Sequence, residues 1–166
     1  MKHARQSGST LLEFTLVGIP MMFVLISTFE VSRLAWNYHT LTAAVAEATR
    51  YAIVHGKNCG RAPNNCTITV GDVARRLHAK GVGLAPQDMT VTLVSNAGSI
   101  TCRLDQCLGN GNMWPPATAN EPGMEIRISA SHDILSMIAM NWPGGGSVKP
   151  FGLLQLRASS REAIQY

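Results

Sequence analysis

The feature that most constrains this chain is an apolar run near its amino terminus. From Leu11 to Phe29 the sequence holds nineteen residues, and Glu13 is the one charged residue among them. As a helix the run would be about 28 Å long, close to the roughly 30 Å thickness of a bilayer's hydrocarbon core. The run therefore predicts one membrane-spanning helix. Glu13 needs an explanation, because an ionised group in hydrocarbon costs on the order of a few kcal/mol.

The charges beside the run predict its orientation. Lys2 and Arg5 precede it, and only Arg33 and His39 are basic or weakly basic in the residues just after it. This bias favours a cytoplasmic amino terminus in the inner membrane and a periplasmic remainder. A cleavable secretory signal is the alternative, but its apolar stretch is usually about 7 to 15 residues and ends at a small-residue site. Here the first A-x-A patterns come at 44–46 and 46–48.

The helix is expected to continue beyond the membrane. Residues 30–55 contain no Gly or Pro, and apolar residues recur at a spacing of three or four, which is typical of a helix with one buried face. These residues are Val31, Leu34, Tyr38, Leu41, Val45, Ala48 and Ala52. Gly56 is the expected stop. Within this helix of some forty-five residues, Pro20 is predicted to cause a kink, because it removes one amide donor and crowds the carbonyl of Leu16.

Length and charge limit the remaining possibilities. The chain has 166 residues, 46% of them hydrophobic and 14% charged, enough for one globular domain. Its formal net charge is +4, with the bases scattered among acids rather than gathered in a stripe. This pattern argues against nucleic-acid binding.

Four cysteines form two close pairs, Cys59 with Cys66 and Cys102 with Cys107. In an oxidising compartment, two short-loop disulfides are the simplest interpretation. Zinc is the alternative, although neither pair has the C-x-x-C spacing and no histidine pair lies nearby at ligand spacing. We therefore expect no metal.

The region from 56 to 166 is predicted to form a soluble α+β domain. A short helix should begin with Asp72 as its cap and end at Gly81, with Val73, Ala74 and Leu77 inward. Four strands with one apolar face each follow. Their inward residues are Met89, Val91 and Leu93; Ile100, Cys102 and Leu104; Met124, Ile126, Ile128 and Ala130; and Leu154, Leu156 and Ala158. The sequence SNAGS at 95–99 favours a hairpin between the first two.

The fold expected from these elements is a long amino-terminal helix, half in the membrane and half amphipathic, packed on a small antiparallel sheet of about four strands. Segments 109–123 and 141–152 are expected to be loops. Their aromatic residues Trp114, Trp142 and Phe151 either dock a partner or are tucked against the sheet edge. The apolar stretch 133–140 is expected to be a second short helix.

No catalytic motif is found. The sequence lacks H-E-x-x-H, G-x-S-x-G and a P-loop lysine. Ser131, His132 and Asp133 are residue types of a catalytic triad, but consecutive strand residues point to alternate faces and cannot line up. We therefore expect neither an enzyme nor a cofactor.

Gly8 ends the basic leader and stands five residues before Glu13, in the sequence G-S-T-L-L-E-F. Together with the apolar run, the F-E-V-S-R-L step at 29–34 and A-A-V-A-E-A-T-R-Y-A at 43–52, this pattern resembles the TadE/TadG-like proteins of the tight-adherence (Flp) pilus assembly system. The resemblance is strongest over residues 6–54. The glycine is similar to the processing site of type IV-like prepilins.

The resemblance implies a minor pilin or pseudopilin that a prepilin peptidase cuts after Gly8, which removes residues 1–8 and makes Ser9 the new amino terminus. Glu13 and Phe14 would then belong to the helix used in assembly. The amine of Ser9 would lie one turn from the Glu13 carboxylate, which also lies near the positive end of the helix dipole. That amine, or one from a neighbouring subunit, could neutralise Glu13; alternatively, Glu13 simply reaches the headgroup layer.

Expected partners are the prepilin peptidase, other pilins and pseudopilins, the inner-membrane assembly platform and the lipid bilayer. The expected divisions are 1–8 (leader), 9–29 (membrane helix), 30–55 (periplasmic continuation) and 56–166 (soluble domain). Two alternatives remain open: an uncleaved, membrane-anchored scaffold or binding subunit, and a secreted domain held by disulfides.

Overall fold

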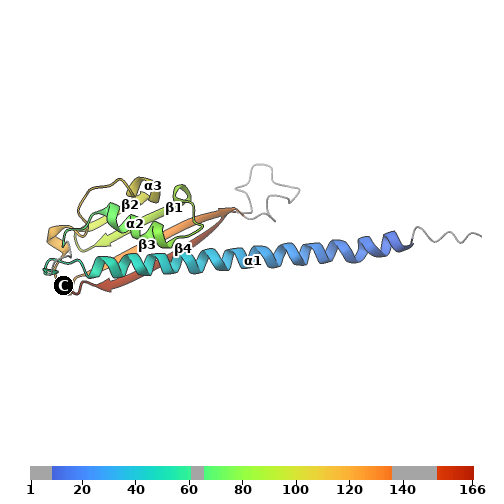
Figure 1. The fold of residues 1–166 in the computed structure, drawn as a ribbon, viewed down its shortest axis with the longest axis horizontal. Coiled ribbons are helices and arrows are strands. Elements are labelled where there is room, and N and C mark those ends of the chain that lie inside the picture. Colours follow the sequence, from blue (N-terminus) through green and yellow to red (C-terminus); the bar gives the residue numbers. More distant parts are fainter. Residues whose placement is uncertain (1–8, 61–65, 136–152) are drawn as a thin grey trace, which may run out of the picture.

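The computed structural model describes residues 9–60, 66–135 and 153–166. One long helix lies along a four-stranded antiparallel sheet (Figure 1), which confirms the predicted α+β fold. The elements in chain order are α1 (Ser9–Ile53), α2 (Val70–Lys80), the 3₁₀ turn η1 (Pro86–Asp88), β1 (Met89–Ser95), β2 (Gly98–Arg103), α3 (Leu104–Cys107), the 3₁₀ turn η2 (Ala117–Ala119), β3 (Glu125–Leu135) and β4 (Leu153–Ala163).

Helix α1 is continuous over its 45 residues, including the turn that contains Pro20. Its carboxyl-terminal half packs on the sheet, and its other half extends beyond it (Figure 1). The buried face begins at Leu41 and continues through Ala44, Val45, Ala48 and Ala52. The prediction that Val31 and Tyr38 share this face is wrong, since both are exposed. A three-four spacing shows which residues align along a helix, but not which of them another element covers.

Gly56 has a different role from the predicted helix stop. The helix ends at Ile53, whose carbonyl accepts a hydrogen bond from the Gln165 amide at 3.0 Å. Gly56 lies under the end of the chain, where a Cβ would be 1.8 Å from the carbonyl oxygen of Tyr166. Glycine is therefore needed for a close approach between backbones.

The sheet has the order β2-β1-β3-β4, with all neighbours antiparallel. The predicted alternation is confirmed in β1 and β3, and Leu93 pairs with Ile100 on one side and Ile128 on the other. A tight turn joins β1 to β2 as predicted, with Ser95 opposite Gly98. Leu104 is buried but begins α3, so its assignment to a strand is wrong.

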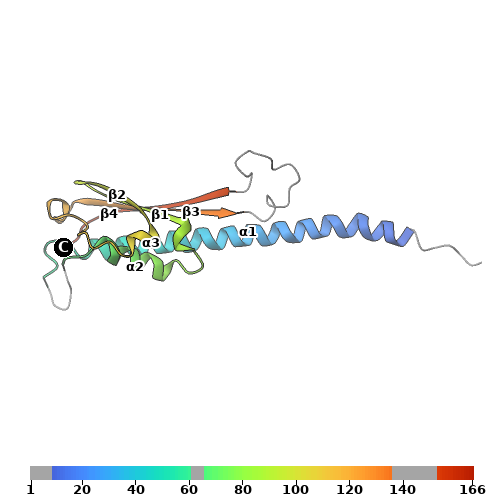
Figure 2. The same ribbon diagram turned by 90° about the horizontal axis from the view of Figure 1, so that it is seen from above.

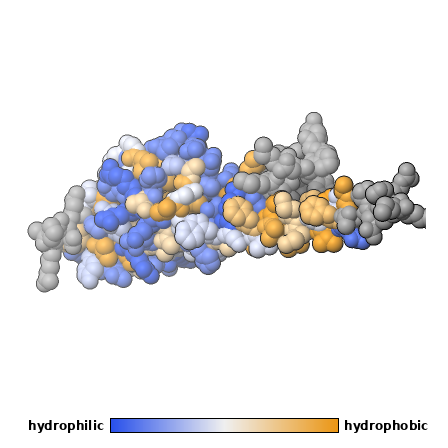
Figure 3. Space-filling view, turned by 45° about the vertical axis from the view of Figure 1, so that its right-hand side comes forward, coloured by the Kyte–Doolittle hydropathy of each residue, from blue (hydrophilic) through white to orange (hydrophobic). Residues whose placement is uncertain are grey.

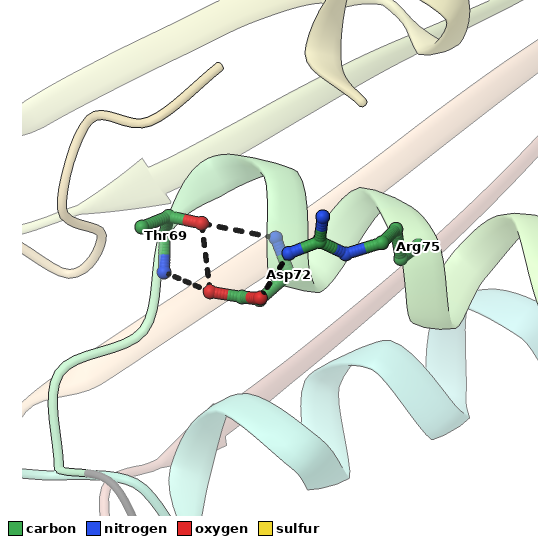
Figure 4. Close-up of polar contacts among 3 residues, drawn as sticks. All are labelled: Thr69, Asp72 and Arg75. Atoms are coloured by element: carbon green, nitrogen blue, oxygen red, sulfur yellow. Dashed lines mark hydrogen bonds and ion pairs between the residues drawn. The ribbon is translucent and has the colours of Figure 1, made fainter. Parts of the chain in front are cut away.

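Helices α1 and α2 lie on the same face of the sheet (Figure 2) and pack against each other. Val73, Ala74 and Leu77 of α2 are buried as predicted, and Gly81 caps its end. The predicted amino-terminal cap is wrong: Thr69 is the cap, and Asp72 is the third residue of a capping box. The Thr69 hydroxyl accepts from the Asp72 amide at 3.1 Å, and the Asp72 carboxylate accepts from the Thr69 amide at 2.8 Å (Figure 4).

The long strands β3 and β4 pair over their full length, from Glu125 opposite Ala163 to Leu135 opposite Leu153. Residues 133–135 therefore belong to a strand, and the predicted helix over 133–140 is wrong there; its remaining residues lie outside those described. In β3 His132 is buried and Asp133 is exposed. Their opposite orientations agree with the argument against a triad.

Disulfides join Cys59 to Cys66 and Cys102 to Cys107, so none of these cysteines offers a thiolate to zinc. Trp114 is only 1% exposed, and its amide donates to the Ile68 carbonyl at 3.0 Å. Of the two predicted roles for this aromatic residue, burial against the domain is confirmed. Trp142 and Phe151 lie outside the described residues.

Candidate membrane and assembly segment

The amino-terminal half of α1 exposes almost every large apolar side chain that it carries. The exposed apolar side chains are Leu11, Leu12, Phe14, Leu16, Val17, Ile19, Met21, Met22, Phe23, Val24, Leu25, Ile26 and Phe29. The apolar surface contrasts with the polar surface of the domain (Figure 3). Leu11–Ile53 is a helix long and apolar enough to cross a membrane.

Two threonine side chains in this half, Thr15 and Thr28, satisfy their hydroxyl groups within the helix. The Thr15 hydroxyl donates to the carbonyls of Leu11 and Leu12 at 3.1 and 2.9 Å. The Thr28 hydroxyl donates to the Val24 carbonyl at 2.8 Å. Because no water is present in hydrocarbon to satisfy such groups, these internal bonds make the segment compatible with lipid.

The predicted processing and assembly residues lie at the start of α1. Gly8 lies outside the described residues, and Ser9 is the first residue of the helix. Glu13 follows four positions later, about 6 Å along the axis or one turn. Glu13 is exposed on the helix surface, and its neighbour Phe14 is 77% exposed. The backbone thus places the amide of Ser9 and the Glu13 side chain on the same part of the helix.

An apolar groove runs along one side of this segment. It is lined by Phe14, Thr15, Gly18, Ile19, Met22, Phe23 and Ile26. Gly18 provides the space, because a Cβ there would already be in van der Waals contact with the Phe14 ring, at 3.8 Å. Small residues allow helices to approach closely inside membranes. This side of α1 therefore has the shape to receive another helix.

An ion pair lies just past the end of the apolar run. Arg33 binds the Glu30 carboxylate at 3.1 Å through Nη2, and the same nitrogen donates to the Leu135 carbonyl at 2.7 Å. Glu30 is only 3% exposed. Glu30 Oε1 and Arg33 Nε are also buried, and neither has a hydrogen-bond partner among the described residues. This cluster of Glu30, Arg33 and Leu135, the junction, ties α1 to the end of β3.

The junction marks where the sheet stops covering the helix. From Arg33 to Ile53, α1 rises about 30 Å, and the 11 residues of β4 span a similar length of about 35 Å. At the far end Gln165, just after β4, bonds to Ile53. The sheet therefore covers α1 from Arg33 to Ile53 and leaves the run from Leu11 to Phe29 outside the domain.

The junction was not predicted from the sequence. The acidic and basic residues of F-E-V-S-R-L contributed only to the family resemblance. The i, i+3 spacing of Glu30 and Arg33 could have suggested an ion pair. Their contact with Leu135, 102 positions away, has no local signal.

Comparison with known proteins agrees with the helix. The family model described as TadE-like protein matches residues 8–50, which confirms the resemblance seen in the sequence. No curated protein and no solved structure matches the chain. The family supports involvement in tight-adherence pilus assembly and suggests other pilus components as partners. The apolar helix fits a single-pass membrane anchor.

Proposed function

We propose that this TadE-like protein is a minor pilin or pseudopilin of a tight-adherence pilus system. Before assembly it is held in the inner membrane by residues 9–29, with the domain in the periplasm. A prepilin peptidase cuts it after Gly8, and the freed helix then packs against the helices of other pilins. The assembly platform is the partner at which this transfer takes place.

The observation that carries the proposal is the continuity of α1. One helix supplies both the exposed apolar segment and the buried face of the domain core, including Leu41, Val45 and Ala48. An apolar surface of this size is stable only in lipid or against other apolar surfaces. A filament whose subunits leave the membrane needs a helix of this kind, because the same apolar surface contacts lipid first and neighbouring helices afterwards.

Glu13 supports the processing step. Cleavage after Gly8 would create an amine on Ser9, one turn away from the Glu13 carboxylate on the helix. The positive end of the helix dipole adds to this attraction. Pairing with its own amine, or with that of a neighbouring subunit, allows the acid to remain in an apolar environment.

The processing step is tested by co-expression with a prepilin peptidase and intact-mass measurement of the membrane-bound protein. The wild-type chain should lose its first eight residues and begin at Ser9. Gly8→Leu should stay uncut, whereas Ser7→Ala, a change in the adjacent leader residue, should be cut normally. A wild-type chain that keeps its leader beside an active peptidase refutes processing and favours an uncleaved, membrane-anchored scaffold.

The role of Glu13 is tested separately. Glu13→Ala should insert into the membrane normally but should be depleted from pili relative to the wild type. Ser27→Ala, a polar-to-alanine change on the exposed surface of the same segment and outside the apolar groove, is the matched control. Equal incorporation of the Glu13→Ala and wild-type proteins would remove the proposed role of the acid.

A further inference from the structure

The end of the soluble domain nearest the apolar run exposes large apolar side chains. Leu135, at the end of β3, is 51% exposed, and Leu154, at the start of β4, is 45% exposed. The backbone pairing joins the two strands through to this end, with Ile134 opposite Leu154. Farther along the same strands, by contrast, the outer-face pairs Thr92 with Ser129 and Ser129 with Ser159 are polar.

The junction fixes the position of this end of the domain along the axis of α1, and so its height relative to the membrane. Arg33 holds the Leu135 carbonyl at 2.7 Å, and Arg33 lies four residues, or about 6 Å, beyond Phe29. The headgroup layer on each side of a bilayer is about 5 to 7 Å deep. If the hydrocarbon core ends near Phe29, the end of β3 lies within the headgroup layer.

The helix itself carries exposed aromatic and apolar residues on both sides of this height. Phe29 and Trp36 are seven residues apart and lie on one side of α1, and Val31 and Tyr38 lie about half a turn away. All four are exposed. Long side chains on a helix lean toward its amino terminus, here toward the membrane. Trp and Tyr are the residues enriched where proteins cross the interface between lipid and water.

We propose that this end of the domain, formed by Leu135 and Leu154 beside the junction, rests in the headgroup layer of the bilayer that α1 crosses. The domain then has two contacts with the membrane, the spanning helix and the ends of β3 and β4, and these fix its tilt. The inference uses only one part of the proposed function, the membrane span. The occupant is lipid because the surface continues directly from that span.

The test places a fluorescent amino acid at single positions of the full chain in vesicles of phosphatidylethanolamine and phosphatidylglycerol, at a low protein-to-lipid ratio. Probes replace Leu135 and Leu154. Matched probes replace Glu125 and Ala163, which are exposed and face each other at the opposite ends of the same strands. A probe at Ile19 reports on the span. Quenchers are headgroup spin-labelled lipid, acyl-chain spin-labelled lipid and acrylamide in the water.

At positions 135 and 154 we expect strong quenching by the headgroup label and several-fold weaker quenching by acrylamide than at 125 and 163. Equal acrylamide quenching at all four sites would refute the membrane contact, provided that the Ile19 probe is quenched by the acyl-chain label. Protection from acrylamide without lipid quenching would show that protein covers the site and would also refute it. An Ile19 probe that lipid does not quench would refute the span itself.

Discussion

Replacing Arg33 by alanine tests the junction most directly. The change removes a charged hydrogen bond to the Leu135 carbonyl, worth about 1.5 to 3 kcal/mol. It also leaves the Glu30 carboxylate, 3% exposed, without its cation. Removing one partner of a buried pair costs about 3 to 5 kcal/mol, and the value should be near the lower end here because the Arg33 side chain is 29% exposed.

We therefore expect the free energy that holds the ends of β3 and β4 against α1 to fall by about 3 kcal/mol. At 1.4 kcal/mol for each factor of ten, this is a roughly 100-fold increase in local opening. Hydrogen exchange of the full chain in lipid nanodiscs measures it. Peptides from the Leu135 end of β3 should exchange faster by about this factor, whereas those from α2 should not change.

A second variant separates the two contributions. Glu30→Gln combined with Arg33→Ala removes the unpaired charge, and it should recover part of the lost protection. Equal exchange in the single and double variants would show that the buried carboxylate costs nothing. An Arg33→Ala variant that exchanges like the wild type would refute the account of the junction as a whole.

Three further predictions concern the stability of the domain, measured by unfolding of the full chain in detergent. Burial lowers the pKa of His132, against the opposing charges of Asp88 and Asp133, from its ordinary value of 6.5. Since the unfolded state then binds the proton more readily, stability should fall as pH drops below about 6.5, down to the lowered pKa; His132→Leu should flatten this dependence. Thr69→Ala should cost about 1 kcal/mol through loss of the helix cap. Gly56→Ala should cost about 1 to 3 kcal/mol or more, because its Cβ would meet the Tyr166 carbonyl.

Each of these predictions has a control in the same chain. His78→Gln changes an exposed histidine and should leave the pH dependence intact. Thr118→Ala changes an exposed threonine outside the capping box, and Gly60→Ala places a Cβ whose nearest neighbour is 4.0 Å away. If a control variant has as large an effect as the variant it is matched to, the contact named for that variant is not the cause of the effect.

The Asp72 carboxylate adds a second pH dependence of stability, at lower pH, and its cause is hydrogen bonding rather than burial. The hydrogen bond from the Thr69 side chain is the main reason why the pKa of Asp72 is below its ordinary value of 3.8, with the Thr69 amide and Arg75 adding to it. The stability that this bond contributes is present above about pH 3.8 and is lost as pH falls through the lowered pKa. Thr69→Ala should weaken this acid-limb dependence, because the Thr69 amide and Arg75 remain, and should remove the cap.

Local patterns were sufficient for several elements of this fold. The apolar run and its helical continuation, the alternation of Met89, Val91 and Leu93, and the buried face of α2 all follow from the period of a single segment. The pattern around Gly8 and Glu13 was sufficient to recognise a resemblance to the TadE-like family, whose model matches residues 8–50. These predictions held because a segment's own periodicity reports its secondary structure and its apolar face.

Errors arose where another segment decided the outcome. Val31 and Tyr38 fit the helical stripe, but Val31 precedes the covered stretch of α1 and Tyr38 is exposed within it. Asp72 is a good capping residue, but Thr69 is the cap and Asp72 is the third residue of the capping box. Gly56 was expected to end the helix, whereas the approach of Tyr166 is what requires a glycine there.

The sequence by itself determined that this chain has one apolar helix with an acid near its start, joined to a small α+β domain. Only the tertiary structure decided how much of this helix the domain covers. The limit of that coverage is set by Glu30, Arg33 and the Leu135 carbonyl, which are brought together from positions 102 residues apart. The physical reason is that burial and ion pairing depend on what covers a residue, and a local pattern does not contain that information.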